Sequence, residues 1–578
     1  MAIETLDSNQ QVALQFKDTF PQELPQGYHL DNFLVLIQDI SNRYHDLLSQ
    51  EENSWIENFL ELSQNAQSLL VRLIMRKGPF FRCDKLKYDD IKDLIATQKE
   101  LADKQFIKIN GSVPIESLLS LCLKAELAST YRYRFDSKTS QAKNQLVEEL
   151  LNESREDSKS QEKIVALINQ QFEWIERLHN DKIRRFLILF FGNSRQGLTE
   201  FVTSQLGIIQ YETYSIEQEN RFFQNRQRLD HLEQLAIIQD WQDDRLSIAT
   251  IDEIQAQIDK LVSLLKASEN IDHYVNHKIQ RAITRITRQL ERLDPEEALK
   301  AYHYSLAPPS RERQARILEK LGRYQEALDL VLAIESSPQH PDEAEKTIPL
   351  KTKLLKRLNQ EIKPTNQLNI NECYLRLSYQ DPEKNIEQQV AEHFIKQGYP
   401  CLHTENQLFL GLFGLFFWDI IYMPCEDAFY NAYQLGPRDL WEQSFASKRE
   451  NAIQARLMEL KAPKKGWQQR LLNTVKTKQG LANYFVNWQR FDSELTELLC
   501  DHIPAEHLDA VFSQILQNPG YYRNGFPDLL LLKDKGYELW EVKGPTDSLQ
   551  TNQKRWLSFF ENHNIPAGVI HVSWGDNE

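Results

Sequence analysis

The sequence has few cysteines, no basic or apolar segment in its first ten residues, no apolar run that could cross a membrane and no excess of positive charge. Its six cysteines lie far apart without a CxxC pair, which argues against a disulfide framework and favours reduced thiols. The start, MAIETLDSNQ, has neither a basic nor an apolar segment, and GLFGLFFWDIIYM (411–423) is shorter than a bilayer span. We therefore expect a cytoplasmic protein without a membrane partner, in which 411–423 forms a buried helix.

The balance of charge argues against a protein that is basic throughout. The 578 residues carry a formal net charge of −15 and 41% are hydrophobic, so the composition is that of a folded protein of about three to five domains. Phosphate contacts require Lys and Arg, and the negative net charge taken alone favours a protein partner over a nucleic acid. A nucleic-acid enzyme of this composition must gather its basic residues on one surface.

The most informative stretch is GFPDLLLLKDKGYELWEVKGPTDSLQTNQ (525–553). An apolar run (LLLL), a KDKG break and an alternating segment at 537–543 predict a β-hairpin. With a side-chain period of two, Glu541 and Lys543 share one face of the second strand. Asp528 opens the first strand, so pairing of the two strands would bring its carboxylate beside Glu541.

These residue types suit the hydrolysis of a phosphodiester. The carboxylates of Asp528 and Glu541, with the backbone carbonyl of Val542, make a hard oxygen site for Mg²⁺ or Mn²⁺. Such ions neutralise phosphate charge and generate hydroxide near neutral pH, while Lys543 would orient or help to deprotonate the attacking water. The bare pattern PD…ExK is also typical of a surface hairpin with a solvated ion pair, and from these residues alone that interpretation is the more common one.

The longer strings around the hairpin carry more information. GFPDLLLL and ELWEVKGPTDSLQTNQKRWL resemble the VRR-NUC version of the PD-(D/E)XK nuclease motif. Upstream, HTE (403–405), GLFGLFFWDIIY (411–422), FYNAYQLGPRDLW (429–441) and SFASKRENAIQARL (444–457) resemble the Fanconi-associated nuclease family. The resemblance covers essentially the whole chain. Some members carry a Cys/His ubiquitin-binding finger near the N-terminus; none is seen in this sequence, so the chain resembles the bacterial-type form.

The resemblance implies a structure-specific DNA nuclease, a 5′ flap endonuclease with 5′–3′ exonuclease activity in DNA interstrand crosslink repair. It implies branched or flapped DNA as the partner, a nucleoid-associated location in a bacterium, and two Mg²⁺ or Mn²⁺ ions as cofactors. It also implies that Glu405 is a third acidic group that helps to hold a second ion, and that Gln553 reaches back to the site. From the residues alone, Glu405 does not stand out from Glu387, Asp419 or Glu426.

The predicted fold is multidomain and predominantly α-helical, with a C-terminal α/β PD-(D/E)XK (VRR-NUC) nuclease domain. We expect a helical N-terminal region at 1–64, a SAP-like DNA-binding domain at 65–150, a TPR-like helical domain at 151–380 and the nuclease domain at 381–578. The TPR-like prediction depends mainly on one unit, LGRYQEALDLVLAI, so helical pairs are expected and not a regular array. WIERL (174–178) is counted among these helices.

Candidate DNA contacts come from the SAP-like helices and from residues near the hairpin. They are Lys124, Arg132, Arg134, Lys138, Lys143, Arg523 and Lys554. Further basic residues, Arg76, Lys77, Arg82, Lys85, Lys87, Arg221, Arg226 and Arg228, could follow a DNA path or form solvated faces.

Some members of the family have a basic pocket for a terminal 5′ phosphate. Gly520 and Asn552 stand where basic side chains would be expected.

Two other functions remain open. One is a non-catalytic DNA-binding or helical-repeat adaptor, and the other is a PD-(D/E)XK Holliday-junction resolvase. The adaptor would bind DNA without metal-dependent cutting, and the resolvase would prefer four arms to a flap.

Overall fold

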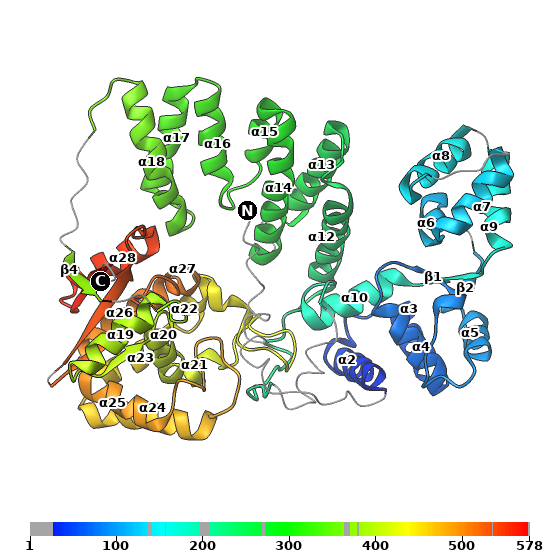
Figure 1. Ribbon diagram of the computed structural model, residues 1–578. Helices are drawn as coiled ribbons and strands as arrows, with labels where there is room; N and C mark the ends of the chain where they lie inside the picture. Colours follow the sequence, from blue (N-terminus) through cyan, green and yellow to red (C-terminus); the bar gives the residue numbers. More distant parts are fainter. Residues whose placement is uncertain are drawn as a thin grey trace. The chain divides into compact units, whose positions relative to one another are not determined.

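The computed structural model of the protein describes residues 27–111, 113–135, 141–156, 158–196, 209–268, 272–362, 370–378, 381–534 and 536–575. These residues form two compact units (Figure 1). The N-terminal unit contains the described residues up to 196 together with 225–233, and the C-terminal unit contains 209–224 and the described residues from 234 onward.

The N-terminal unit begins with a small helical bundle. Its helices are α2 (Tyr28–Tyr44), α3 (Gln50–Leu60), α4 (Gln64–Ile74) and α5 (Leu94–Asp103). Ser49 caps α3 through a capping box with Glu52, which satisfies two backbone amides at the helix start. Trp55 stacks on Phe59 and meets Phe106 and Phe186 edge-on or tilted, so an aromatic core holds the bundle together.

A three-stranded antiparallel sheet adjoins this bundle. Its strands are β1 (Phe80–Arg82), β2 (Ile107–Ile109) and β3 (Trp174–Arg177), in the order β1-β3-β2. The prediction of a helix at 174–178 was wrong, because β3 fills the gap between two strands that lie far away in the sequence. This pairing also joins the two sides of the predicted boundary at residue 150, so that boundary does not separate compact units.

Four helices form a second core in the N-terminal unit. They are α6 (Ile115–Leu121), α7 (Lys124–Phe135), α8 (Lys143–Glu156) and α9 (Ser158–Asn169). Leu118, Leu127, Leu150 and Ile168 are fully buried in it, and Trp174 of β3 seals one side. The unit also contains α10 (Asn180–Phe191) and the start of α12 (Arg226–Arg245).

A run of helices opens the C-terminal unit. After the rest of α12 come α13 (Ile251–Ser268), α14 (His273–Leu293), α15 (Pro295–Tyr302), α16 (Ser310–Lys320), α17 (Tyr324–Ser336) and α18 (Pro341–Arg357). From α13 to α18, each helix packs against the next one in the chain (Figure 1). The expectation of helical pairs is therefore met in this region.

A five-stranded mixed sheet follows. Its strands are β4 (Asn371–Leu377), β5 (Cys401–His403), β6 (Leu529–Lys533), β7 (Gly536–Lys543) and β8 (Ala567–Trp574), in the order β4-β8-β7-β6-β5. The predicted hairpin is β6 and β7, which pair antiparallel. The sequence did not predict β4, which lies parallel to β8 at the sheet edge and shows that this sheet begins before residue 381.

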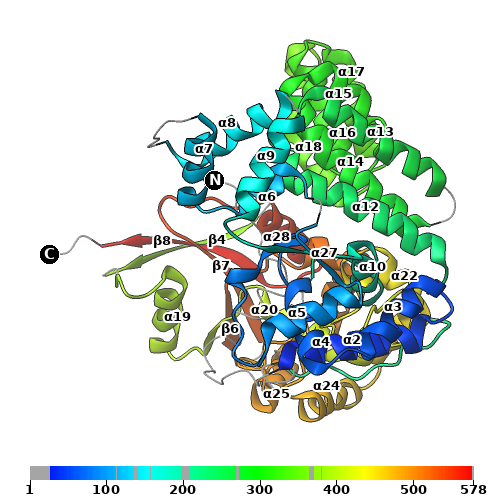
Figure 2. The ribbon, with the colours of Figure 1, turned by 90° about the vertical axis from the view of Figure 1, so that its right-hand side faces the viewer.

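Each face of the sheet has its own core. Leu529, Leu531, Trp540 and Val542 pack on one face with α19 (Ile386–Lys396). The alternate residues of the same strands pack on the other face, where Trp556 and Phe560 of α28 (Thr551–Asn562) are buried. The strands and both helices can be followed in Figure 2.

Capping boxes begin two helices of the nuclease domain. Asn385 caps α19 through a capping box with Gln388. Gln550 caps α28, whereas Asp547 accepts a hydrogen bond from the amide of Gly544. In both cases the side chain nearest to the first helical turn makes the cap.

Helices pack around the apolar segment that was predicted to be buried. It forms α20 (Gln407–Phe416) and α21 (Trp418–Ile421). Around it lie η3 (Arg438–Trp441), α22 (Ser444–Lys448), α23 (Glu450–Leu460), α24 (Lys464–Lys478), α25 (Ser493–His502), α26 (Ala505–Gln517) and α27 (Pro519–Tyr522). A Cβ atom on Gly411 would lie 2.2 Å from the ring of Phe491, so the close approach requires glycine there. Within the described residues, no helix has both the length and the apolar character of a membrane span.

Candidate active site

The hairpin brings Asp528 and Glu541 together. Leu529 pairs with Trp540, so the next positions outward, Asp528 and Glu541, lie opposite each other. The Oδ2 atom of Asp528 accepts a hydrogen bond of 2.8 Å from the backbone amide of Val542. The side chain of Asp528 is thereby fixed to the strand that carries Glu541.

Two side chains hold Glu541 from different elements. Its Oε1 atom lies 2.8 Å from Nζ of Lys543, which is on the same face of β7, and 2.5 Å from Nε2 of Gln553 on α28. Because Oε1 of Gln553 accepts the backbone amide of Gln550, the amide nitrogen of Gln553 is the end that points to Glu541. The helix cap therefore sets the orientation of a hydrogen-bond donor in the site.

Both carboxyl groups hold their protons more tightly than usual. Burial raises the pKa of Glu541 to about 8, and the charge of Asp528 adds to this effect beyond the opposing influence of Lys543. Burial also raises the pKa of Asp528, with further contributions from the charges of Glu387 and Glu405. Two acidic groups crowded in a poorly solvated place favour a bound cation.

The carboxylates of Asp528 and Glu541 suit a divalent metal ion, and the burial of Glu541 supports this independently of the pKa values. Glu541 is only 1% exposed, and its Oε2 atom is buried without a hydrogen-bond partner. A buried carboxylate oxygen without a partner is costly, and a cation would satisfy it. Among the described residues, however, no three His, Cys, Asp or Glu side chains stand ready as a complete metal cluster. The two carboxylates that meet on adjacent strands are those of Asp528 and Glu541.

Glu405 lies beside this pair but is exposed, and its role as a ligand stays a prediction. The backbone amides of Thr404 and Glu405 both donate to the carbonyl of Asp528, at 2.8 and 3.1 Å. Glu405 has a φ of 40°, a left-handed conformation that is uncommon for residues other than glycine. The turn that carries Glu405 is thus fixed to the strand end that carries Asp528.

The structure distinguishes Glu405 from other acidic residues that the sequence alone ranked equally with it. Asp419 pairs with Arg456 at 2.6 Å. Glu387, in the first turn of α19, is half-buried and its negative charge reaches Asp528. Glu387 is therefore a further acidic group near Asp528, which sequence reasoning named only as one of several alternatives.

Two supporting residues were missed by sequence reasoning. The Oδ1 atom of Asn406 accepts the backbone amides of Gly525 and Phe526, at 2.8 and 3.2 Å, and so holds the loop before Asp528. Arg490 donates to the carbonyl of His403 at 2.8 Å. Both contacts join segments more than 80 residues apart, and no local pattern announces them.

The predicted DNA contacts remain predictions, and their positions differ. Lys124, Arg132 and Lys554 are exposed on helices. Arg523 lies 4.6 Å from the ring centre of Trp441, and burial lowers its pKa. Lys138 and the side chain of Arg134 lie outside the described part of the chain.

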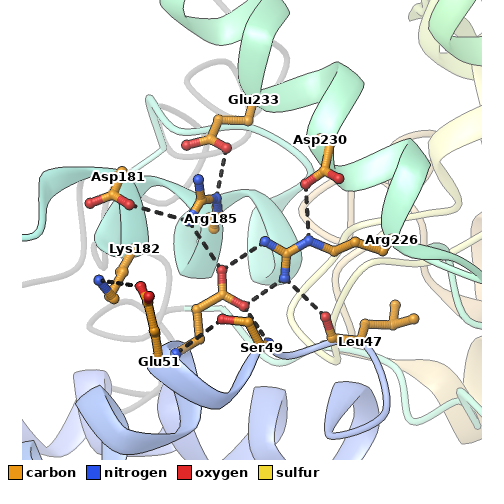
Figure 3. Close-up of polar contacts among 10 residues, drawn as sticks. Leu47, Ser49, Glu51, Asp181, Lys182, Arg185, Arg226, Asp230 and Glu233 are labelled. Carbon is orange, nitrogen blue, oxygen red and sulfur yellow. Dashed lines mark hydrogen bonds and ion pairs between the residues drawn. The ribbon is translucent and has the colours of Figure 1, made fainter.

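Three of the further basic candidates are structural. Arg82 is 7% exposed and makes ion pairs with Asp84 and Glu126. Arg221 is 2% exposed. Arg226 bonds to Glu52, as does Arg185, in a polar cluster that joins α3, α10 and α12 (Figure 3). Arg82 and Arg226 neutralise carboxylates within the fold, and the sequence does not distinguish such arginines from exposed ones.

Comparisons with known proteins show similarity to nucleases, both in the sequence and in the fold. The model "FAN1, HTH domain" matches residues 27–108, and the model "VRR-NUC domain" matches residues 450–574. The chain is 28% identical over 555 residues to a Fanconi-associated nuclease 1 homolog of Pseudomonas aeruginosa, covering 95% of this chain and 96% of that protein. It is 24% identical to Fanconi-associated nuclease 1 of Homo sapiens, covering 94% of this chain and 62% of the human protein.

A solved structure has the same fold along nearly the whole chain. The crystal structure of paFAN1 bound to a two-nucleotide 5′ flap DNA with gap is similar with a TM-score of 0.82 and 28% identity. The match covers 96% of this chain and 100% of that one. The predicted fold class, largely helical with a C-terminal VRR-NUC domain, is confirmed.

Proposed function

The chain belongs to the Fanconi-associated nuclease family, and on this premise we propose that it hydrolyses phosphodiester bonds of branched DNA near 5′ flaps in a metal-dependent reaction. The solved relative of the same fold is bound to 5′ flap DNA. We extend the proposal to 5′–3′ exonuclease action and to a role in interstrand crosslink repair in the cytoplasm, associated with the nucleoid in a bacterium.

One observation carries the proposal. Asp528 and Glu541 meet on adjacent strands with raised pKa values, and Lys543 lies on the same strand within 2.8 Å of Glu541. A solvated surface hairpin would expose these groups, whereas Glu541 and Lys543 are 1% and 8% exposed. The common structural interpretation of PD…ExK therefore does not fit this hairpin.

The residues that would hold Mg²⁺ or Mn²⁺ are Asp528, Glu541 and the carbonyl of Val542, with Glu405 helping to hold a second ion. When bound, such an ion supplies Lewis acidity and neutralises phosphate charge. Lys543 orients the attacking water or offsets charge that develops on the phosphate. Gln553 keeps the Glu541 carboxylate in place from α28.

The other regions would bring DNA to this site. A SAP-like domain at 65–150 would contact the duplex through Lys124, Arg132, Arg134 and Lys138, while Arg523 and Lys554 would lie closer to the cut. The helices α12 to α18, which lie within the predicted TPR-like region at 151–380, would connect this region to the nuclease domain. A 5′-phosphate pocket like that of some family members is not part of the proposal, since Gly520 and Asn552 carry no positive charge.

The test uses labelled 5′ flap, splayed and four-way junction DNA with Mg²⁺, with Mn²⁺ or with EDTA. We expect metal-dependent cutting that favours the flap and is lost in Asp528→Asn. Asp534→Asn, an exposed residue in the turn of the same hairpin, is the matched control and should cut like wild type. Binding without cutting would support the adaptor, and a preference for four arms would support the resolvase.

A further inference from the structure

An exposed row of arginines runs along α14 (His273–Leu293). Ile279, Ile283, Ile286 and Leu290 are fully buried and form the apolar face of this helix. The opposite face carries four exposed arginines at spacings of four, three and four residues, here called the α14 stripe: Arg281, Arg285, Arg288 and Arg292. In a chain of net charge −15, this is a local concentration of positive charge.

Internal ion pairs do not account for the α14 stripe. Arg285 pairs with Asp243 at 2.7 Å, and both side chains are exposed. In the part of the chain that the structure describes, Arg281, Arg288 and Arg292 have no acidic partner within ion-pair distance. The one acidic residue of α14, Glu291, turns away to bond with Arg313 of α16. The arginines of the α14 stripe therefore differ from Arg82 and Arg226, which are ion-paired within the fold.

Contacts at the start of α14 fix the helix to the unit that contains the catalytic sheet. The hydroxyl of Tyr274 lies 2.8 Å from that of Tyr430, and the guanidinium of Arg438 lies 4.4 Å from the ring centre of Tyr274. Tyr430 lies in the segment that leads into η3, and Arg438 is the first residue of η3. A helix held at one end and packed against α13 and α15 presents its charges as a rigid array.

We propose that the α14 stripe binds the phosphate backbone of a duplex arm of the DNA substrate, independently of base sequence. This inference deepens the proposed function and rests on it for the identity of the ligand. From Arg281 to Arg292 the helix rises ~16 Å, with an arginine every ~5 Å. A duplex places a phosphate every ~3.4 Å per strand along its axis, so long flexible arginines can reach successive phosphates.

The test measures DNA affinity without divalent metal, so that its outcome does not depend on whether the site cuts. Arg281→Gln, Arg288→Gln and Arg292→Gln are combined, and binding of a labelled duplex is followed by fluorescence anisotropy over a series of salt concentrations. Each lost phosphate contact lowers the slope of log affinity against log salt by about one, so we expect a slope smaller by about 2 to 3. At ~0.1 M salt we expect Kd to rise about tenfold, equally for different base sequences.

Two further variants make the result specific. The triple Arg→Lys variant at the same positions keeps the charge and should keep most of the salt dependence. Lys300→Gln, Lys320→Gln and Lys356→Gln together remove the same charge from exposed positions of α15, α16 and α18, and should bind like wild type. Circular dichroism verifies that each variant is folded.

The inference is overturned if the α14 variant binds with the affinity and salt slope of wild type, or if the control triple weakens binding equally. The first result would leave the stripe to an acidic protein partner or to solvent. Failure of the proposed function has a different signature, because wild-type protein would then bind DNA but not cut it with Mg²⁺ or Mn²⁺.

Discussion

The Nζ atom of Lys543 lies 2.8 Å from Oε1 of Glu541, on the oxygen that also accepts the amide of Gln553. Oε1 of this carboxylate therefore accepts hydrogen bonds from two side chains, while Oε2 has no hydrogen-bond partner. This asymmetry leaves a defined place for a cation, and it has consequences for stability that can be measured without substrate.

The first prediction concerns Glu541→Gln in metal-free protein. The folded pKa of Glu541 is about 8, above its ordinary value of 4.5, so the unfolded chain releases this proton first as pH rises. The stability that protonated Glu541 contributes to the fold is fully present below about pH 4.5 and is lost as pH rises toward 8. At pH 8 the Gln variant should therefore melt higher than wild type, by about 1 to 3 °C, with a smaller difference at pH 5.

Calorimetry with Mn²⁺ completes this measurement. The ion should raise the Tm of wild type at pH 8 and leave the Gln variant nearly unchanged, because deprotonated ligands are required. Glu538→Gln, on the other face of the same strand, is the control. A Gln variant that melts below wild type at pH 8 would contradict the assignment.

Lys543→Met should lower the rate of cutting about 10²- to 10⁴-fold at saturating DNA and metal, the range typical of a lost group that acts on a proton or a charge in the transition state. Lys533→Met is the control, since Lys533 belongs to the same hairpin but pairs with Glu538 at the surface. Single-turnover rates on a 5′ flap measure the effect. Equal rates for the two variants would remove Lys543 from the reaction.

Asn406 should act as a positioning residue. Asn406→Ala removes the acceptor of the Gly525 and Phe526 amides, and we expect metal-dependent activity to fall about 10- to 100-fold, the usual cost of losing an outer contact of a metal site. Asn406→Asp keeps the oxygen and should recover most of the activity. Titration of Mn²⁺ should show the Ala variant needing more metal, which a loss of packing alone would not cause.

The sequence predicted the parts of the site that lie close together along the chain. Asp528, Glu541 and Lys543 belong to one hairpin, where a period of two fixes which side chains share a face. Glu405 entered through family resemblance, since its place beside Asp528 depends on a turn that no local pattern reveals.

Other features could not be predicted because distant partners decide them. β4 is an edge strand with mostly exposed residues, so it lacks the alternation of a half-buried strand. Trp174 to Arg177 adopt a strand because two other strands lie on either side. Arg82 and Arg226 looked like DNA contacts, yet each meets a carboxylate more than 40 residues away.

The last prediction concerns the polar cluster of the N-terminal unit, centred on Glu52. Glu52 is 1% exposed and accepts hydrogen bonds from Arg185, Arg226 and the amide of Ser49. Burial alone would raise its pKa, but the bonds and charges of Arg226, Ser49 and Arg185 outweigh burial, and the pKa is lowered. The stability that Glu52 contributes is therefore present at neutral pH and is lost as pH falls below about 4.5.

Glu52→Gln should lower the free energy of unfolding of this unit by about 2 to 3 kcal/mol at pH 7, less than for a fully buried pair because both arginines are partly exposed. Urea unfolding followed through Trp55, on the same helix, measures the loss. The difference from wild type should shrink as pH falls toward 3. Glu51→Gln, whose side chain is 84% exposed beside Lys182 (Figure 3), should stay within about 0.5 kcal/mol of wild type. Equal losses for the two variants would show that the cluster around Glu52 adds nothing beyond a surface charge.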